Sequence, residues 1–146
     1  MIIGAGEVGF NTARMLSQEG HDVVLVEQDG ALVERASEQL DALVIHGNGA
    51  SPRMLAEAGI EKADLLVAAS SSDEVNIIAC LAARSLGVPR TVARIHNPDY
   101  HDPQEPFAQK MLGIDFIIHT EQAATEEIKK ALLVPGAINV DTFAGE

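Results

Sequence analysis

The sequence is poor in cysteine, in positive charge and in long hydrophobic runs, and each shortage excludes a class of protein. Its single cysteine, Cys80, cannot form an internal disulfide, which fits a reducing compartment. The 10 lysines and arginines stand against 22 acidic residues, and the formal net charge of −12 argues against a protein that binds nucleic acid through its phosphates. No segment approaches the ~20 apolar residues that a membrane-spanning helix needs.

The start of the chain also lacks the features of a secretory signal. Met1-Ile2-Ile3 runs directly into Gly4 with no basic segment before it. We therefore expect a cytoplasmic protein. A length of 146 residues, with 47% hydrophobic and 22% charged residues, fits one folded domain with its own core.

Short apolar segments alternate along the chain with segments of helical periodicity. The apolar segments are rich in Val, Ile and Leu without polar alternation, as in strands that are covered on both faces. The expected strands are Met1–Ile3, Asp22–Glu27, Ala42–Ile45, Asp64–Ala69, Thr91–Ile95 and Asp115–Ile118. The expected helices are Glu7–Glu19, Ala31–Leu40, Pro52–Ala58, Asp73–Leu86, Gln104–Leu112 and Glu121–Leu133.

This alternation predicts a doubly wound α/β fold with a parallel six-stranded sheet, because right-handed crossovers place helices on both faces. The expected strand order is 3-2-1-4-5-6. We expect the domain to occupy residues 1–134, since Val134-Pro135-Gly136 breaks the last predicted helix. Residues 135–146 then begin a connection to a C-terminal subdomain that this chain lacks, and the short first strand also suggests a fragment.

A glycine motif follows the first predicted strand and opens the first predicted helix. Its sequence is Gly4-Ala5-Gly6-Glu7-Val8-Gly9, the G-x-G-x-x-G fingerprint of Rossmann dinucleotide-binding domains. In this motif Gly4 allows the tight turn, Gly6 lets a pyrophosphate approach the backbone, and Gly9 lets the helix pack closely on the sheet. The helix N-terminus presents unpaired N–H groups to the phosphates. The motif predicts a nucleotide site at this turn.

Glu27 closes the second predicted strand, near the ~20-residue spacing at which this motif places its ribose-binding acid. Its carboxylate can accept hydrogen bonds from a ribose diol and would repel a 2′-phosphate. This favours NAD, NADH or another adenosine nucleotide over NADP. The alternative is a solvated acid at the end of a strand.

Two further loops follow predicted strands, and ligands of such sheets bind at the carboxyl ends of strands. The first, Gly47-Asn48-Gly49-Ala50-Ser51, places Asn48 either at the edge of an adenine or simply in a turn. The second, Ser70-Ser71-Ser72-Asp73-Glu74, could lie beside the pyrophosphate and second ribose. It also reads as a capping box at Ser71-Ser72-Asp73-Glu74, and the two roles are compatible.

Arg94 lies in the fifth predicted strand between apolar residues, a costly position for a guanidinium without an anion. It could contact a ligand phosphate or pair internally with Asp73 or Glu74. We favour the ligand.

The sequence offers no convincing catalytic or metal-binding constellation. The histidines are scattered, and the segment from His96 to Asp102 matches no standard metal spacing. Cys80 is expected in the core. On the helix that contains it, a stripe of Val75, Ile78, Ala79, Ala82 and Leu86 should face the sheet. The apolar residues Ile77 and Leu81 beside it fit either contact with a partner subunit or ordinary burial.

With these motifs the chain resembles the N-terminal domain of the RCK, or KTN, family of Trk-system potassium uptake regulators (TrkA-N). The motifs that carry the resemblance are Gly4-Ala5-Gly6-Glu7-Val8-Gly9, Gly47-Asn48-Gly49-Ala50-Ser51-Pro52, Ala63-Asp64-Leu65-Leu66-Val67-Ala68, Ser71-Ser72-Asp73-Glu74, Ala93-Arg94-Ile95 and Pro135-Gly136-Ala137.

The resemblance implies a cytosolic homo-oligomer at the inner face of the membrane that regulates a potassium channel or transporter and is not an enzyme. NAD or NADH, with ATP and ADP as further candidates, would occupy the site and change the ring shape. The implied nucleotide contacts are Gly4, Ala5, Gly6, Glu7, Val8, Glu27, Ser70, Ser71 and Arg94. The family commonly has Asp at the position of Glu27, which makes the preference among nucleotides less certain.

Two other functions fit the residues. One is the cofactor domain of an NAD-dependent dehydrogenase, whose substrate domain and acid/base residues would lie outside this chain. The other is a Rossmann-shaped interaction domain with an empty site.

Overall fold

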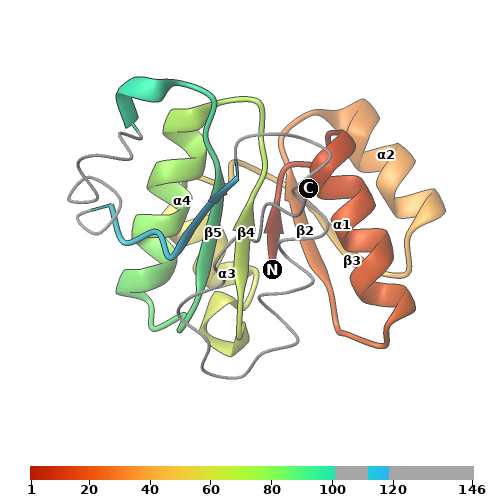
Figure 1. Cartoon of the computed structure of the whole chain (residues 1–146). Helices are drawn as coiled ribbons and strands as arrows, with labels where there is room; N and C mark the ends of the chain where they lie inside the picture. The colour runs from red at the N-terminus through yellow and green to blue at the C-terminus, as the bar shows by residue number, and fades with distance from the viewer. Residues whose placement is uncertain (101–111, 119–146) are drawn as a thin grey trace, which may run out of the picture.

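The computed structural model describes residues 1–100 and 112–118 as a parallel sheet with helices on both faces (Figure 1). The strands are β1 (Ile2–Ile3), β2 (Val24–Glu27), β3 (Leu43–His46), β4 (Leu66–Ala68), β5 (Thr91–Arg94) and β6 (Phe116–Ile118). The helices are α1 (Glu7–Gln18), α2 (Gly30–Gln39), α3 (Pro52–Glu57) and α4 (Asp73–Ser85), with short 3-10 turns η1 (Ile60–Lys62) and η2 (Pro98–Tyr100).

The six strands pair in parallel in the order β3-β2-β1-β4-β5-β6, which confirms the predicted topology. The short strand β1 lies between β2 and β4, with Ile3 opposite Val26 on one side and Ala68 on the other. The strand order reverses at β1. In open α/β sheets the ligand crevice forms at such a reversal, beyond the carboxyl ends of the strands.

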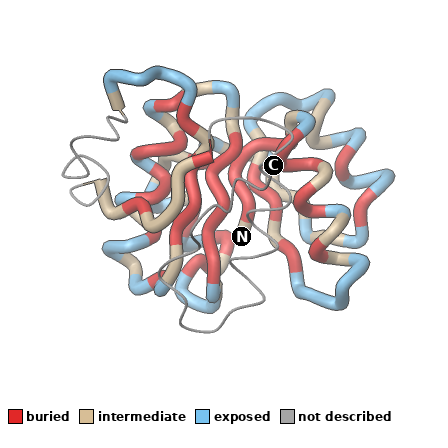
Figure 2. The backbone as a smooth tube through the Cα atoms, viewed as in Figure 1, coloured by how far each residue is buried: buried red, intermediate tan, exposed pale blue. Residues whose placement is uncertain are grey.

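Alternate strand residues enter two cores, one on each face of the sheet. Ile2, Leu25 and Val67 pack with residues of α1 and α2, whereas Ile3 and Val26 pack with residues of α3 and α4. Figure 2 shows the central strands buried and the outer sides of the helices exposed. Burial on both faces explains why these central segments carry apolar residues on both sides of the sheet.

The observed helices and strands start and end within two residues of the predicted bounds. The predicted helix Glu121–Leu133 lies outside the described residues, as does Gln104–Leu112 except for Leu112, which is in a turn. The predicted boundary at residue 134 and the segment 135–146 also lie outside them. Within the described residues, no helix combines the length and apolarity that crossing a bilayer requires.

The predicted sheet-facing stripe of α4 is wrong in part: Ala79 is buried and Val75, Ala82 and Leu86 pack against the core, but Ile78 is exposed. The buried residues of this helix are Asp73, Asn76, Ile77, Ala79, Cys80 and Ala83. Ile78, expected against the sheet, is 46% exposed, and Leu81 is 38% exposed. The polar residue Asn76 is buried although the apolar pattern did not include it. Its side chain donates hydrogen bonds to the Ser70 and Arg94 carbonyls at the neighbouring strand ends.

Candidate functional site

The glycine turn joins β1 to α1 with very little space around it. Gly4 has a φ of +94°, a conformation that favours glycine, and its amide donates to the Val26 carbonyl at 2.9 Å. A Cβ on Gly4 would lie 2.7 Å from the backbone of Ser70, and a Cβ on Gly9 would lie 1.9 Å from the Gly4 carbonyl oxygen. Gly4 and Gly9 therefore bring the turn, the helix and the strand-end loop into direct backbone contact.

Gly6 differs from the other two glycines of the motif. Its backbone is extended (φ −65°, ψ −171°), and a Cβ built on it would meet no atom within 4 Å. Nothing in the part of the chain that the structure describes thus requires glycine at this position. Among those residues the space in front of Gly6 is open, as the approach of a ligand to the backbone would need.

The N-terminus of α1 is also bare. Side chains cap α2, α3 and α4, through Asp29, Ser51 and Ser72 respectively, whereas α1 alone among the α-helices of the described residues has no side-chain cap. Its first intrahelical bond runs from the Phe10 amide to the Gly6 carbonyl at 2.9 Å, so the preceding amides have no acceptor within the helix. These amides and the helix dipole form an anion-binding surface. Of the predicted contacts here, Glu7 is exposed and Val8 is buried.

Glu27 points toward this turn. Its Oε2 accepts a hydrogen bond from the Ala5 amide at 2.5 Å, and its Oε1 accepts from the amides of Gln28 at 2.6 Å and Asp29 at 2.8 Å. The pairing of β1 with β2 brings the ends of the two strands together and so sets this contact. The half-buried carboxylate is fixed beside the glycine turn, where a ribose diol bound there would reach it.

A cavity of about 160 Å³ opens between the glycine turn and the neighbouring strand ends. Its lining includes four of the predicted site residues, Gly4, Glu27, Ser70 and Ser71. Gly47 and Gly49 also line it, but Asn48 does not. The Asn48 Oδ1 instead accepts from the Ala50 amide at 2.9 Å, as in the turn that the sequence offered as the alternative.

The loop after β4 is held by a buried side chain that the sequence reasoning did not identify. Asn76 is fully buried, and its Oδ1 accepts from the Ser70 amide at 2.9 Å. Its Nδ2 donates to the carbonyls of Ser70 at 3.0 Å and Arg94 at 2.8 Å. A single amide thus joins the ends of β4 and β5. The sequence signal that could have identified Asn76 is a polar residue within the apolar run of α4.

The N-cap of α4 is Ser72, not Ser71 as a capping box would require. The Ser72 hydroxyl accepts from the Val75 amide at 3.3 Å and donates to Glu74 Oε2 at 2.9 Å. The glutamate stands one residue too early to reach back to the N-cap amide. Ser71 is therefore exposed and free of the capping role.

A second, more open cavity of about 530 Å³ lies between the N-terminus of α4 and the end of β5. Its lining is Ser71, Ser72, Asp73, Glu74, Arg94 and His96. The structure thus brings Arg94 to the same cavity as Ser71.

Asp73 fixes the segment that follows β5. Its carboxylate accepts from the His96 amide at 2.9 Å and the Asn97 amide at 2.7 Å, and it lies 3.1 Å from His96 Nδ1. Burial acts to raise the pKa of Asp73, but the hydrogen bonds from Asn97 and His96 outweigh it and hold the pKa below 3.8. The carboxylate is therefore ionised near neutral pH and belongs to the frame of the cavity.

Comparison with known proteins matches this chain to one family over most of its length. The family model of the TrkA-N domain covers residues 1–120. The chain belongs to the TrkA-N domain family.

Two curated relatives share 40% identity with this TrkA-N domain. The Trk system potassium uptake protein TrkA homolog of Methanothermobacter thermautotrophicus aligns over 92% of the chain and 60% of its own length. The homolog of the same name from Archaeoglobus fulgidus aligns over 99% of the chain and 33% of its own length. The chain thus spans less than two thirds of either relative.

Solved structures share the fold of the TrkA-N domain at lower identity. The TrkA-N domain of the inner membrane protein ybaL from Escherichia coli superposes with a TM-score of 0.70 at 20% identity, covering 90% of this chain and 93% of that one. The GsuK channel bound to NAD gives a TM-score of 0.65 at 22% identity, covering 80% of this chain and 20% of the channel chain. GsuK has also been solved bound to ADP, with the same TM-score and 22% identity over 81% of this chain and 30% of that one.

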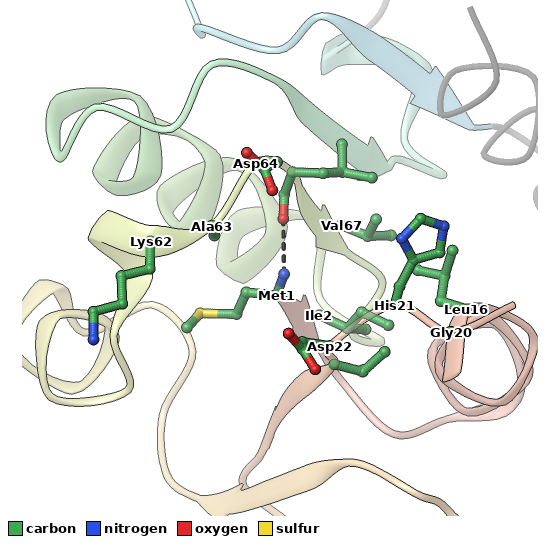
Figure 3. A pocket seen from close by; sticks show the side chains of 12 residues that line it. Met1, Ile2, Leu16, Gly20, His21, Asp22, Lys62, Ala63, Asp64 and Val67 are labelled. Carbon is green, nitrogen blue, oxygen red and sulfur yellow. Dashed lines mark hydrogen bonds between the residues drawn. The ribbon is translucent and has the colours of Figure 1, made fainter. Parts of the chain in front are cut away.

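A third cavity, of about 330 Å³, opens at the amino ends of the strands (Figure 3). Met1, Asp22, Lys62 and Asp64 are among its lining residues, and the Met1 amino group donates to the Leu65 carbonyl at 2.8 Å. Burial lowers the pKa of this amino group to about 6. None of the predicted site residues of the TrkA-N domain lines this cavity, which lies at the edge opposite the glycine turn.

Metal binding and thiol chemistry have little support among residues 1–100 and 112–118. No group of three or more His, Cys, Asp or Glu side chains there could hold a metal ion. Cys80 is buried in the core as predicted, its Sγ lies 3.7 Å from the Val92 carbonyl oxygen, and burial raises its thiol pKa to about 12. Such a thiol is a poor nucleophile.

Proposed function

We propose that this chain is the nucleotide-sensing domain of a longer Trk-type potassium uptake regulator. The ligand is NAD or NADH, with ADP and ATP as further candidates, bound across the carboxyl edge of the sheet. The observation that carries the proposal is the N-terminus of α1, which has no side-chain cap, lies beside the fixed Glu27 carboxylate and, among the described residues, leaves space for a Cβ at Gly6. The proposed contacts are Gly4, Ala5, Gly6, Glu7, Val8, Glu27, Ser70, Ser71 and Arg94, with Asn48 at the edge of the site.

Each part of an adenosine diphosphate moiety has a chemically suitable partner in the proposed site. The pyrophosphate would lie in front of Gly6, where the amides of α1 and its dipole favour negative charge. The adenosine ribose would lie at Glu27, whose carboxylate accepts hydroxyl hydrogen bonds and repels a 2′-phosphate. GsuK, which shares this fold, has been solved bound to NAD and to ADP, and this supports a nucleotide as the ligand.

The biological role follows the relatives, which are named Trk system potassium uptake proteins. In our proposal the full-length protein is a cytoplasmic homo-oligomer at the inner face of the membrane that controls a potassium channel or transporter. It binds nucleotide without catalysis. A ligand can shift the equilibrium between two states only by its difference in affinity for them, and a ~100-fold difference supplies about 2.7 kcal/mol per site.

Substitution of Gly6 tests the proposal with a matched control. A Cβ at Gly6 or at Gly30 meets no protein atom within 4 Å, and both residues lie at helix N-termini, Gly30 as the first residue of α2. Gly6→Ala should therefore fold normally but place a methyl group where the pyrophosphate would lie.

Calorimetric titration of NADH and ADP should show binding to the wild type and to Gly30→Ala. Binding to Gly6→Ala should be weaker by about a hundredfold or more, equivalent to about 2.7 kcal/mol. Equal affinity of Gly6→Ala and the wild type, with both folded by circular dichroism, would show that the ligand does not approach this turn.

A further inference from the structure

The turn that follows β2 sets the orientation of the Glu27 carboxylate. Glu27 Oε1 accepts hydrogen bonds from the amides of Gln28 at 2.6 Å and Asp29 at 2.8 Å, whereas Oε2 accepts from the Ala5 amide at 2.5 Å. Since each carboxylate oxygen has two lone pairs, the one that is left for a ribose hydroxyl lies on Oε2. The direction of Oε2 therefore depends on how firmly the two amides of this turn hold Oε1.

His46, the last residue of β3, contacts the same turn from the neighbouring strand. Its Nε2 lies 2.9 Å from the Gln28 carbonyl oxygen. Because a carbonyl oxygen can only accept a hydrogen bond, Nε2 carries the proton and is the donor. The strand register places His46 opposite Glu27, and the Gly47 amide donates to the Glu27 carbonyl at 2.8 Å. The end of β3 thus binds two consecutive carbonyl groups at the end of β2.

One peptide group connects the imidazole of His46 to the carboxylate of Glu27. The Gln28 carbonyl and the Asp29 amide belong to this group; the carbonyl accepts from His46, and the amide donates to Glu27 Oε1. A trans peptide group is planar, and its C=O and N–H point in opposite directions. When the imidazole holds the oxygen on one side, the N–H is therefore fixed toward the carboxylate on the other. Rotation of this group would weaken both hydrogen bonds together.

We propose that His46 is a positioning residue of the nucleotide site, which acts on the ribose through Glu27. By fixing the peptide group between Gln28 and Asp29, it keeps Oε1 on the two amides and leaves Oε2 available to the ribose. His46 is exposed and is not among the residues that line the cavity beside Glu27, so its effect on the ligand is indirect. The inference rests on the proposed function, because it takes Glu27 as the acceptor for the ribose.

A pair of ligands distinguishes this role from a merely structural one. If His46 only stabilised the end of β3, its loss would weaken all nucleotides alike, whereas a positioning role affects only ligands with ribose hydroxyls. Calorimetric titration of the full chain compares ADP with 2′,3′-dideoxy-ADP, which lacks the hydroxyls that Glu27 would bind. The dissociation constant of dideoxy-ADP should exceed that of ADP by about tenfold or more in the wild type. In Glu27→Ala this ratio should fall to about one.

Two substitutions of His46 test the hydrogen bond to the Gln28 carbonyl. His46→Phe keeps a ring but removes the donor, so the ratio should fall to about threefold or less while the affinity for dideoxy-ADP stays unchanged. His46→Gln retains an N–H donor, and its ratio should stay near the wild-type value. His21→Phe is the matched control, because it changes an exposed histidine at the opposite edge of the sheet and should alter neither constant (Figure 3).

The inference is overturned if His46→Phe, folded by circular dichroism, keeps the wild-type ratio. It is also overturned if the ratio falls as far in His46→Gln, or if His46→Phe weakens ADP and dideoxy-ADP equally. If neither ligand binds to the wild type, or if the wild type does not distinguish them, the proposed function fails and this inference fails with it. A preference for ADP that Glu27→Ala abolishes and His46→Phe leaves intact contradicts the inference alone.

Discussion

At the end of β2 the Glu27 carboxylate accepts hydrogen bonds from the backbone amides of Ala5, Gln28 and Asp29. These bonds fix its orientation in the absence of a ligand, so little side-chain freedom is lost when a ribose binds. The Glu27 side chain spans from the end of β2 to the glycine turn, and this contact shows that its carboxylate faces the turn.

Replacement of this carboxylate by the neutral amide should change the choice between NADH and NADPH. In Glu27→Gln the repulsion of a 2′-phosphate is lost, while a hydrogen-bonding group of the same size remains. The ratio of the NADPH and NADH dissociation constants, measured by fluorescence titration, should fall about tenfold or more. Glu38→Gln removes the same charge from an exposed position on α2 and should leave this ratio unchanged. An unchanged ratio in Glu27→Gln as well would remove Glu27 from the ribose site.

At the scale of the elements, α4 connects the parts of the site. Its buried Asn76 joins the backbone of Ser70 to that of Arg94, and Asp73 holds the amides of His96 and Asn97. The sequence pattern predicted the existence and bounds of this helix but not which face it buries. Counting apolar positions could not show that an asparagine would be the residue facing the strand ends, since its partners are backbone groups of distant segments.

Removal of the Asn76 side chain should cost both stability and binding. Asn76→Ala removes the buried hydrogen bonds that the side chain makes with the backbone of Ser70 and Arg94, so the free energy of unfolding should fall by about 2–4 kcal/mol. Nucleotide affinity should fall with it, because the loop of Ser70 and Ser71 loses its support. Urea denaturation followed by circular dichroism measures the first effect.

Asn11→Ala is the control for this experiment, because the Asn11 side chain makes an exposed hydrogen bond to Arg14 on the surface of α1. Its free energy of unfolding should stay within about 0.5 kcal/mol of the wild-type value. An Asn76→Ala protein as stable as Asn11→Ala would show that the buried amide does not hold the strand ends together.

At the scale of the whole molecule, the sheet order was predictable because the right-handed crossover rule leaves few ways to connect alternating strands and helices. The order places the glycine turn, the Glu27 carboxylate and the serine loop at one edge, and the sequence identified all three. It could not give the division of that edge into two cavities. The second cavity brings Glu74 and Arg94 together from α4 and β5, and that proximity follows from tertiary contacts.

The chain has a formal net charge of −12, which repels a polyanionic ligand. Such a ligand binds only where local groups favour negative charge. The amides at the start of α1 provide such a place without a lysine. The cavity at the opposite edge is lined by Asp22 and Asp64 with Lys62. Nucleotide binding by this chain therefore requires that an anion bind at the carboxyl edge of the sheet.

An NMR titration of the ¹⁵N-labelled chain with ADP tests this dependence directly. The account predicts that the largest amide shift changes occur at Gly6, Glu7 and Val8, accompanied by changes at Ala5 and Gln28 as Glu27 meets the ribose. Shift changes confined to the opposite edge, around Asp22 and Asp64, or no change at any amide at millimolar ADP, would contradict it.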